Sequence, residues 1–294
     1  MPQPRVALFT GNYIHVRDGV SLTLNRVVTY LVEQGVRVKV FGPTIEHPPL
    51  KPAGEFVPVP SFPMPGRPEY QIAHKFPKEV RKELEAFNPD LVHIATPDYL
   101  GLRALLWARR KKVPVVSTYH THFVSYANYY KLNVVMELVW EYLKWFYSHC
   151  RHLYVPTQSM AEELSRRGIE KGIKIWARGV ETDLYSPDKR DMNWRRGIGF
   201  GEDDIVVTFV SRLVWEKELE TFADAVNSAK RYNKRIRAMV VGDGPAREGL
   251  EEMLPEAHFT GFLKGDELAR AYASSDVFFF PSHTETFGNV TLEA

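Results

Sequence analysis

Short apolar runs alternate with stretches of helical periodicity along the first part of the chain. Residues 6–10 form a run rich in β-branched and aromatic side chains, and apolar side chains then recur at helical spacing from Leu22 to Leu31. The same reasoning predicts strands at 36–41, 91–94, 115–119, 152–155 and 173–176. Helices are predicted at 78–87, 99–110, 133–148 and 159–166. Such alternation favours crossover connections and a mostly parallel sheet with helices on both faces.

The alternation restarts after a polar segment. Residues 187–204 contain three glycines and are predicted to be a linker between a domain at 1–186 and a second domain at 205–294. In the second domain, strands are predicted at 206–210, 237–241, 258–260 and 277–280, and helices at 218–231, 246–254 and 266–274. Two doubly wound α/β domains would face a cleft lined by the carboxyl ends of their strands.

Residues 42–68 interrupt this alternation with nine prolines. The segment is long for a simple connection, so two interpretations stay open: a functional loop, or a well-packed extended segment.

Composition limits the class of protein. The 294 residues predict about two domains, and 44% hydrophobic and 25% charged residues are ordinary for a globular chain. No apolar run approaches the ~18 residues of a membrane span, and the first residues leave no room for a signal peptide. The single cysteine, Cys150, excludes an internal disulfide framework. We therefore expect a cytoplasmic protein.

Charge is unevenly distributed between the two halves. Residues 1–185 carry a net charge of +7, and residues 186–294 carry −5. The basic half favours an anionic surface or substrate, whereas nucleic-acid binders show denser clusters, so no nucleic-acid partner is expected. The densest cluster, residues 109–112, is also explained as the cationic end of a helix.

Two carboxylates near the end of the sequence follow a predicted strand. Glu285 and Glu293 are eight positions apart, and a helix beginning near Gly288 would point its free N–H groups toward a phosphate or sugar oxygen. One glutamate could then contact one end of an elongated ligand, and the other glutamate the other end. A solvated helix face is the alternative interpretation.

A basic segment follows the first strand of the second domain. Arg212 and Lys217 lie five apart at the carboxyl end of that strand, where they could neutralise a diphosphate. A surface ion pair with Glu216 or Glu218 is equally compatible with the spacing. The segment 242–245, Gly-Asp-Gly-Pro, predicts a strand-to-helix turn but lacks the G-x-G-x-x-G dinucleotide pattern.

Two residues of the first domain also lie at a helix start or after a strand, as the candidates of the second domain do. Gly19 lies at the start of the first helix, where the backbone can approach a ligand, and His120 follows the strand 115–119. His120 could contact an oxygen in the cleft, pack as a core histidine, or chelate a metal together with His122. No Asp-x-Asp sequence occurs, so nothing indicates a carboxylate-held metal, and no cofactor is expected.

Taken in order, these segments resemble the retaining glycosyltransferases of family 4, which have the GT-B fold. The matching stretches are 18–20 (Asp-Gly-Val), 117–121, 155–164, 176–183, 211–217, 241–245, 261–263 and the pair Glu285-x7-Glu293. The resemblance covers nearly the whole chain. It is strongest to the branch that transfers hexoses to lipids, including α-mannosyl and sulfoquinovosyl diacylglycerol synthases, and the Pro-rich segment 57–70 supports that branch.

The resemblance implies roles for the donor-binding residues. Arg212 and Lys217 would hold the donor diphosphate and stabilise the leaving nucleotide without metal. Glu293 would bind the ribose hydroxyls, and the backbone amides of Phe287 and Gly288 would meet the donor near the helix start. The nucleotide sugar is thus a co-substrate.

It also implies roles at the reacting sugar. Glu285 would bind a hydroxyl of the transferred hexose, His120 would contact the reacting sugar, and Gly19 would complete the phosphate cradle. Retention would proceed by front-face attack, with the leaving phosphate accepting the acceptor's proton, so no protein nucleophile is required. The implied acceptor is a lipid or glycolipid at an anionic membrane surface, with the enzyme peripheral at the inner face.

The sequence departs from the family pattern in three places. Glu218 stands where the family usually has Gly, and Ser211 stands where Gly often precedes the arginine. The family's second domain continues past Glu293, so an incomplete second domain is expected, and the activity of this chain by itself stays open. The alternatives are another GT-B enzyme, such as a nucleotide-sugar epimerase or a phosphorylase, or a non-catalytic nucleotide-sugar-binding fragment. The donor base, the hexose and the oligomeric state are not determined by sequence.

Overall fold

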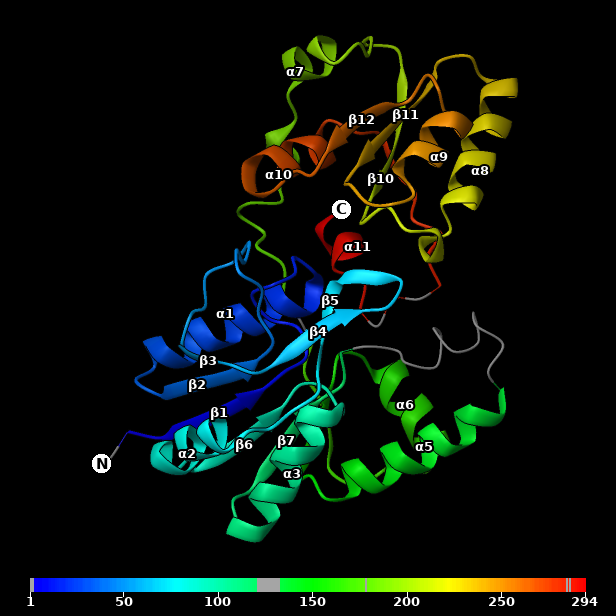
Figure 1. The fold of residues 1–294 in the computed structure, drawn as a ribbon. Helices are drawn as coiled ribbons and strands as arrows, with labels where there is room; N and C mark the ends of the chain where they lie inside the picture. Colours follow the sequence, from blue (N-terminus) through cyan, green and yellow to red (C-terminus); the bar gives the residue numbers. More distant parts are fainter. Residues whose placement is uncertain (1–2, 121–132, 178, 284, 286) are drawn as a thin grey trace. The chain divides into compact units, whose positions relative to one another are not determined.

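A computed structural model describes residues 3–120, 133–177, 179–283, 285 and 287–294 (Figure 1). The chain divides into two compact units, Met1–Ala177 and Arg178–Ala294. Each unit contains its own parallel sheet. The fold class expected from the alternation of strands and helices is therefore confirmed: an α/β chain with two doubly wound domains.

The first unit is built on seven parallel strands in the order β3-β2-β1-β6-β7-β8-β9. Its strands are β1 (Arg5–Phe9), β2 (Arg37–Gly42), β3 (Glu55–Pro58), β6 (Leu91–Ile94), β7 (Val115–Thr118), β8 (His152–Val155) and β9 (Ile173–Ile175). Its helices are α1 (Gly19–Glu33), α2 (Lys78–Phe87), α3 (Tyr99–Lys111), α5 (Asn133–Ser148) and α6 (Gln158–Arg166). The strand order reverses between β1 and β6, and ligands of doubly wound sheets bind outside the carboxyl ends at such a point.

Alternate residues of β1 show that both faces of this sheet are covered. Ala7 and Phe9 belong to one buried cluster, which includes Leu84 of α2. Leu8 belongs to another, which includes Leu24 of α1. Successive side chains of a strand point to opposite faces, so the near-continuous apolar run seen in the sequence is what a doubly covered strand requires.

The Pro-rich segment is extended and partly paired. After β3, which lies parallel to β2, the strands β4 (Ser61–Met64) and β5 (Arg67–Ala73) form an antiparallel hairpin (Figure 1). Val59 and Ala73, at the base of the hairpin, are buried in the core. The segment is therefore extended and paired in part, but between residues 44 and 68 only Val59 is buried, so packing does not decide between the two interpretations.

The second unit has four parallel strands in the order β12-β11-β10-β13. The strands are β10 (Ile205–Val210), β11 (Ile236–Val241), β12 (His258–Gly261) and β13 (Val277–Phe278). The helices are α7 (Met192–Gly197), α8 (Leu219–Tyr232), α9 (Arg247–Met253), α10 (Gly265–Ala273) and α11 (Asn289–Glu293), with 3-10 turns η1 (Pro187–Lys189) and η2 (Trp215–Lys217). Here the strand order reverses between β10 and β13.

The last predicted strand, 277–280, is shorter than expected. Its ladder with β10 covers Val277 and Phe278, and the amide of Phe279 donates once more to Thr208 O at 3.0 Å. Phe279 and Phe280 then leave the ladder and pack against the buried cluster around Phe209 and Phe222. Side-chain packing, and not further strand pairing, therefore explains the apolar run beyond Phe278.

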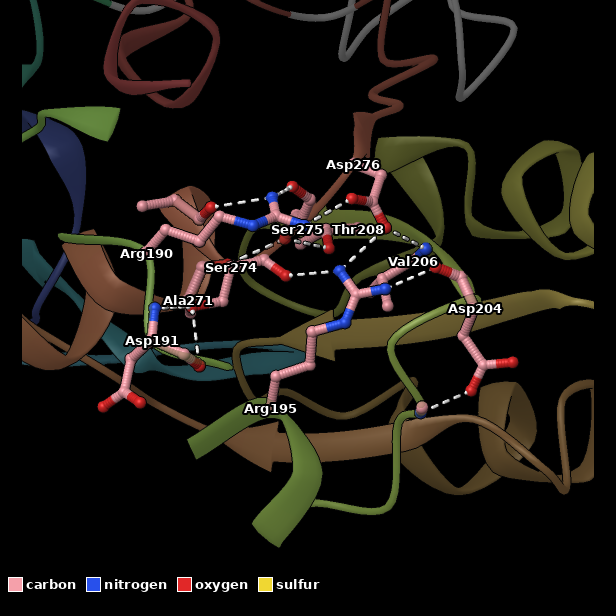
Figure 2. Close-up of polar contacts among 12 residues, drawn as sticks. Arg190, Asp191, Arg195, Asp204, Val206, Thr208, Ala271, Ser274, Ser275 and Asp276 are labelled. Carbon is pink, nitrogen blue, oxygen red and sulfur yellow. Dashed lines mark hydrogen bonds and ion pairs between the residues drawn. The ribbon is translucent and has the colours of Figure 1, made fainter. Parts of the chain in front are cut away.

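The segment predicted as a linker contains η1 and α7 and belongs to the second unit. Arg195 of α7 is fully buried and donates to Asp276 Oδ2 at 2.8 Å, and Arg190 donates to Asp276 Oδ1 at 2.7 Å (Figure 2). The backbone amide of Val206 also donates to this carboxylate. These contacts attach residues 190–195 to the edge of the sheet.

Of the helices in the described residues, none combines the length and apolar character that crossing a membrane requires.

Candidate donor site

Two loops of the second unit come together beyond the carboxyl ends of β10 and β13. The first loop, 211–217, follows β10, and the second, 281–288, follows β13. β10 and β13 are neighbours in the sheet at the point where the strand order reverses. The side chain of Lys217 in the first loop donates to Glu285 Oε1 in the second. The fold therefore joins a cation and a carboxylate that are 68 positions apart in sequence.

The first loop is held by backbone contacts and two buried side chains. Leu213 and Val214 are buried, and Leu213 N donates to Asp243 O at 3.0 Å. In return, Ala246 N donates to Leu213 O at 3.1 Å. Arg212, between Ser211 and Leu213, is half-buried. The backbone that carries Arg212 is thus bonded to the 242–246 turn.

Two glycines make this close approach possible. A Cβ atom at Gly242 would lie 1.8 Å from Ser211 O, and one at Gly244 would lie 2.3 Å from Leu213 O. Gly242 also has a φ of +135°, which side chains other than glycine rarely adopt. The Gly-Asp-Gly-Pro turn therefore serves as the surface on which the Arg212 loop lies, a role more specific than the flexible turn predicted from sequence.

Glu218 adopts an unusual backbone conformation directly after Lys217. Its φ is +59° and its ψ is 43°, in the left-handed region, and it stands at the start of α8. Glycine is the residue best suited to this conformation, which explains why the family pattern has Gly here. The Glu218 carboxylate accepts from Thr221 Oγ1 at 3.2 Å and lies 3.7 Å from His283 Nδ1. A side chain in place of glycine thus adds a second contact between the two loops.

The Lys217–Glu285 pair is partly shielded from solvent. The Lys217 side chain is 16% exposed and that of Glu285 is 31% exposed. The sequence left open whether Lys217 serves in a surface ion pair with Glu216 or Glu218, and spacing alone did not indicate Glu285. Lys217 and Glu285, assigned separately to the diphosphate and the hexose, are thus adjacent in space.

Glu293 lies at the far end of the short helix α11. Gly288, in a left-handed conformation with φ +77°, forms the N-cap of α11, close to where the sequence predicted the helix start. Phe287 is half-buried and directly precedes this cap. The hydroxyl of Tyr272, on α10, donates to Glu293 Oε2 at 3.1 Å. Nothing in the local spacing of the sequence links α10 to residue 293, so this contact could not be predicted.

The first unit contains the other two predicted site residues. Gly19 is the first residue of α1 and is exposed, and the preceding Asp18 caps the helix by accepting from Ser21 N at 2.8 Å. His15 lies in the same loop and is buried. Its Nδ1 lies 3.1 Å from Pro43 O, which can only accept, so Nδ1 carries the proton. Burial lowers the pKa of His15, which keeps the ring neutral.

His120 lies two residues after the end of β7 and is 7% exposed. Its ring meets the ring of Trp176 edge-on, with centroids 5.8 Å apart. Trp176 in turn contacts Tyr154 of β8. His122, the partner in the alternative metal site, lies outside the described residues. Within the described part of the chain, no group of three or more His, Cys, Asp or Glu is arranged to hold a metal ion.

Family models match both halves of the chain. Residues 17–184 match the model described as Glycosyltransferase Family 4, and residues 204–294 match the model described as Glycosyl transferases group 1. The two matches together include every predicted site residue, from Gly19 to Glu293.

Curated relatives cover most of the chain. It is 33% identical over 294 residues to a GDP-mannose-dependent alpha-mannosyltransferase of Corynebacterium glutamicum, covering 99% of this chain and 70% of that protein. It is 31% identical over 239 residues to the sulfoquinovosyl transferase SQD2 of Arabidopsis thaliana, and the match covers 80% of this chain and 46% of that protein. An alpha-monoglucosyldiacylglycerol synthase of Streptococcus pneumoniae is 25% identical over 305 residues, covering 99% and 68%.

Solved structures have the same fold. A sucrose-phosphate synthase from Thermosynechococcus elongatus superposes with a TM-score of 0.74 at 18% identity, over 99% of this chain and 78% of that one. At this level of identity the likeness concerns the fold.

Proposed function

This chain belongs to glycosyltransferase family 4, and on that premise we propose that it transfers a hexose from a nucleotide sugar to a lipid acceptor, with retention of anomeric configuration. The observation that carries the proposal is the meeting of the Arg212–Lys217 loop with Glu285 beyond β10 and β13. Cations at this point suit a diphosphate, and a neighbouring carboxylate suits a sugar hydroxyl.

Each donor group has a proposed partner in the second unit. The guanidinium of Arg212 and the ammonium of Lys217 neutralise the diphosphate, and Glu285 accepts a hydrogen bond from a hydroxyl of the hexose. Glu293 accepts from the ribose hydroxyls. The amides of Phe287 and Gly288, at the start of α11, face the donor between these two ends.

The reaction breaks the bond between the anomeric carbon and the diphosphate oxygen and forms a bond from that carbon to the acceptor oxygen. The leaving phosphate takes the proton of the acceptor hydroxyl on the same face, so configuration is retained. Arg212 and Lys217 stabilise the charge that develops on the leaving nucleoside diphosphate, a role that a metal ion has in other transferases. Gly19 and His120 supply contacts to the phosphate and to the reacting sugar from the first unit.

A lipid acceptor is supported by relatives and by charge. One relative is named as a synthase of alpha-monoglucosyldiacylglycerol, a glycolipid, and the net charge of residues 1–185 is +7. The aromatic stretch of α5 contributes mainly to the core, because Trp140, Phe146 and Tyr147 are buried. Trp145 and Leu138 remain 39% and 72% exposed. A basic unit with exposed apolar groups suits peripheral binding to an anionic leaflet, at the cytoplasmic face.

The test is a panel of nucleotide sugars, with GDP-mannose first, incubated with the protein and vesicles containing diacylglycerol and phosphatidylglycerol. Mass spectrometry should find one hexosylated lipid, and NMR should show the donor's anomeric configuration in it. A free sugar or epimer formed without acceptor would indicate an epimerase instead. A sugar phosphate formed with inorganic phosphate would indicate a phosphorylase. Nucleotide binding without any turnover would indicate a non-catalytic binding protein.

A further inference from the structure

Glu293 is held by a residue from a different helix. Tyr272 Oη donates to Glu293 Oε2 at 3.1 Å. Burial, together with the neighbouring Glu293 carboxylate, raises the pKa of Tyr272 above its ordinary value, so its hydroxyl stays protonated and remains a donor. A hydrogen bond to a carboxylate from a fixed phenol restricts the orientation of a side chain that otherwise samples several rotamers.

Helix α11 needs such support because it is short. It has five residues, Asn289–Glu293, and helices of this length do not persist by intrinsic propensity. Its first turn is held by Val290, which packs against the same buried cluster as Tyr272 and Phe278. The hydrogen bond from Tyr272 secures the last residue of the helix, and with it the direction of the carboxylate.

Tyr272 is itself fixed by the residues that follow it. The chain carbonyls after Tyr272 accept from two arginines: Arg190 donates to Ala273 O at 3.2 Å and to Ser275 O at 2.8 Å, and Arg195 donates to Ser274 O at 3.1 Å (Figure 2). Both arginines also bind Asp276. The end of α10 is thus fastened to residues 190–195, where Arg195 has no exposed surface. The ring of Tyr185 meets the Tyr272 ring edge-on at 5.9 Å.

We propose that Tyr272 is a positioning residue for nucleotide recognition: it holds one carboxylate oxygen of Glu293 so that the other faces the ribose hydroxyls of the donor. The inference rests on the proposed function, because it takes the ribose as the ligand of Glu293. The Arg190–Arg195–Asp276 cluster fixes the end of α10, and so keeps the Tyr272 hydroxyl within hydrogen-bond distance of Glu293 on α11. Selectivity for ribose over deoxyribose therefore depends on a tyrosine 21 positions before the carboxylate that contacts the sugar.

The experiment measures ribose selectivity and not affinity alone. Dissociation constants of GDP and UDP, and of the 2′,3′-dideoxy form of whichever binds more tightly, are determined by calorimetry for the 294-residue protein. The variants are Tyr272→Phe, Glu293→Gln and, as a matched loss of a hydroxyl, Tyr232→Phe, whose side chain on α8 is 92% exposed. Tyr272→Phe should weaken ribonucleotide binding about tenfold, or ~1.4 kcal/mol, and leave the dideoxy form unaffected. Tyr232→Phe should match the parent on both.

The outcomes separate the proposal from the function on which it rests. Loss of ribose selectivity in both Tyr272→Phe and Glu293→Gln supports the positioning role. Selectivity lost in Glu293→Gln and kept in Tyr272→Phe overturns it, while the ribose assignment stands. Equal weakening of ribo and dideoxy forms by Tyr272→Phe indicates a structural role and also overturns it. If the parent binds neither GDP nor UDP, ADP and CDP are measured in the same way, and binding of none of the four overturns both the inference and the proposed function.

Discussion

Lys217 and Glu285 form an ion pair that connects the loop after β10 to the loop after β13. Each has its own proposed task at the donor, Lys217 at the diphosphate and Glu285 at the hexose. Since the two side chains touch, a diphosphate on Lys217 lies next to the carboxylate that holds the sugar. Under the proposed function the pair would set the spacing between the phosphate end and the hexose end of the donor, and changes at either residue should separate binding from transfer.

Glu285→Gln should reduce hexose transfer while nucleotide binding is largely kept. The amide preserves the shape but loses a charge-assisted hydrogen bond to the hexose, a loss of about 1.5–3 kcal/mol. Nucleoside diphosphate affinity should stay equal or rise slightly, because Lys217 no longer has a charged competitor. Turnover and calorimetry on the same preparation measure both. Glu220→Gln, an exposed change on α8, is the control, and equal turnover of the Glu285 variant and the parent contradicts the sugar contact.

Lys217→Ala and Arg212→Ala should each weaken nucleoside diphosphate binding, because each removes a cation that we propose binds the phosphates. The expected loss is about 1.5–3 kcal/mol per residue, against little change for Lys234→Ala, which removes an exposed cation from the same unit. EDTA or Mg²⁺ should leave turnover of the parent protein unchanged. Turnover that chelation abolishes and Mn²⁺ restores would be incompatible with the metal-independent mechanism.

Glu218→Gly should stabilise the second unit. The left-handed backbone at φ +59° is strained for glutamate and favourable for glycine. Losing the hydrogen bond from Thr221 offsets part of the gain, so the expected increase in the free energy of unfolding is ~0.5–1 kcal/mol. Glu220→Gly makes the same chemical change in the first turn of α8 and should destabilise by ~1 kcal/mol. Chemical denaturation measures both, and a destabilised Glu218→Gly contradicts the strain argument.

Gly242→Ala should be strongly destabilising and should also reduce nucleotide binding. The new methyl group would lie 1.8 Å from Ser211 O, so the Arg212 loop has to move. We expect a loss of ~3 kcal/mol or more in the free energy of unfolding. Gly197→Ala is the control, since a Cβ there meets no atom within 4 Å. Thermal unfolding and GDP binding report the two effects, and a Gly242→Ala protein with parental values for both would refute the close-packing role.

His93 should make stability depend on pH. Burial lowers the pKa of His93 to about 4, from 6.5 in the unfolded chain, and its Nε2 lies 3.1 Å from Thr118 Oγ1. Because the folded pKa is the lower one, the unfolded state binds the proton first as pH falls. Above pH 6.5 protonation of His93 does not affect the free energy of unfolding. Between pH 6.5 and 4 it lowers that free energy, by ~3 kcal/mol at most.

The measurement for His93 is the difference between the parent and His93→Asn in free energy of unfolding across this pH range. The asparagine keeps a polar partner for Thr118 but does not titrate, so groups common to both proteins cancel. The parent should lose more stability than the variant on going from pH 7 to pH 4. Parallel pH profiles would show that His93 is not the group responsible.

The sequence by itself was sufficient for the order and type of most elements. Strands predicted at 91–94 and 152–155 have the same bounds as β6 and β8, and the helix predicted at 78–87 has the bounds of α2. These patterns are local: β-branched runs favour strands, and apolar spacing near 3.6 favours helices. The order of short motifs also led to the family, to which the comparisons assign the chain. The site roles taken from that resemblance remain predictions.

Tertiary structure decided which of these residues meet. Lys217 reaches Glu285 because β10 and β13 are neighbours, and Tyr272 reaches Glu293 because α10 and α11 pack in one cluster. Such pairs depend on strand order and on packing between elements distant in sequence, which residue spacing does not encode. The predicted linker at 187–204 illustrates the same limit. Its polar composition predicted a linker, yet Arg195 is buried, because Asp276 and the backbone carbonyls of Ser274 and Asp204 replace the water that a guanidinium would otherwise require.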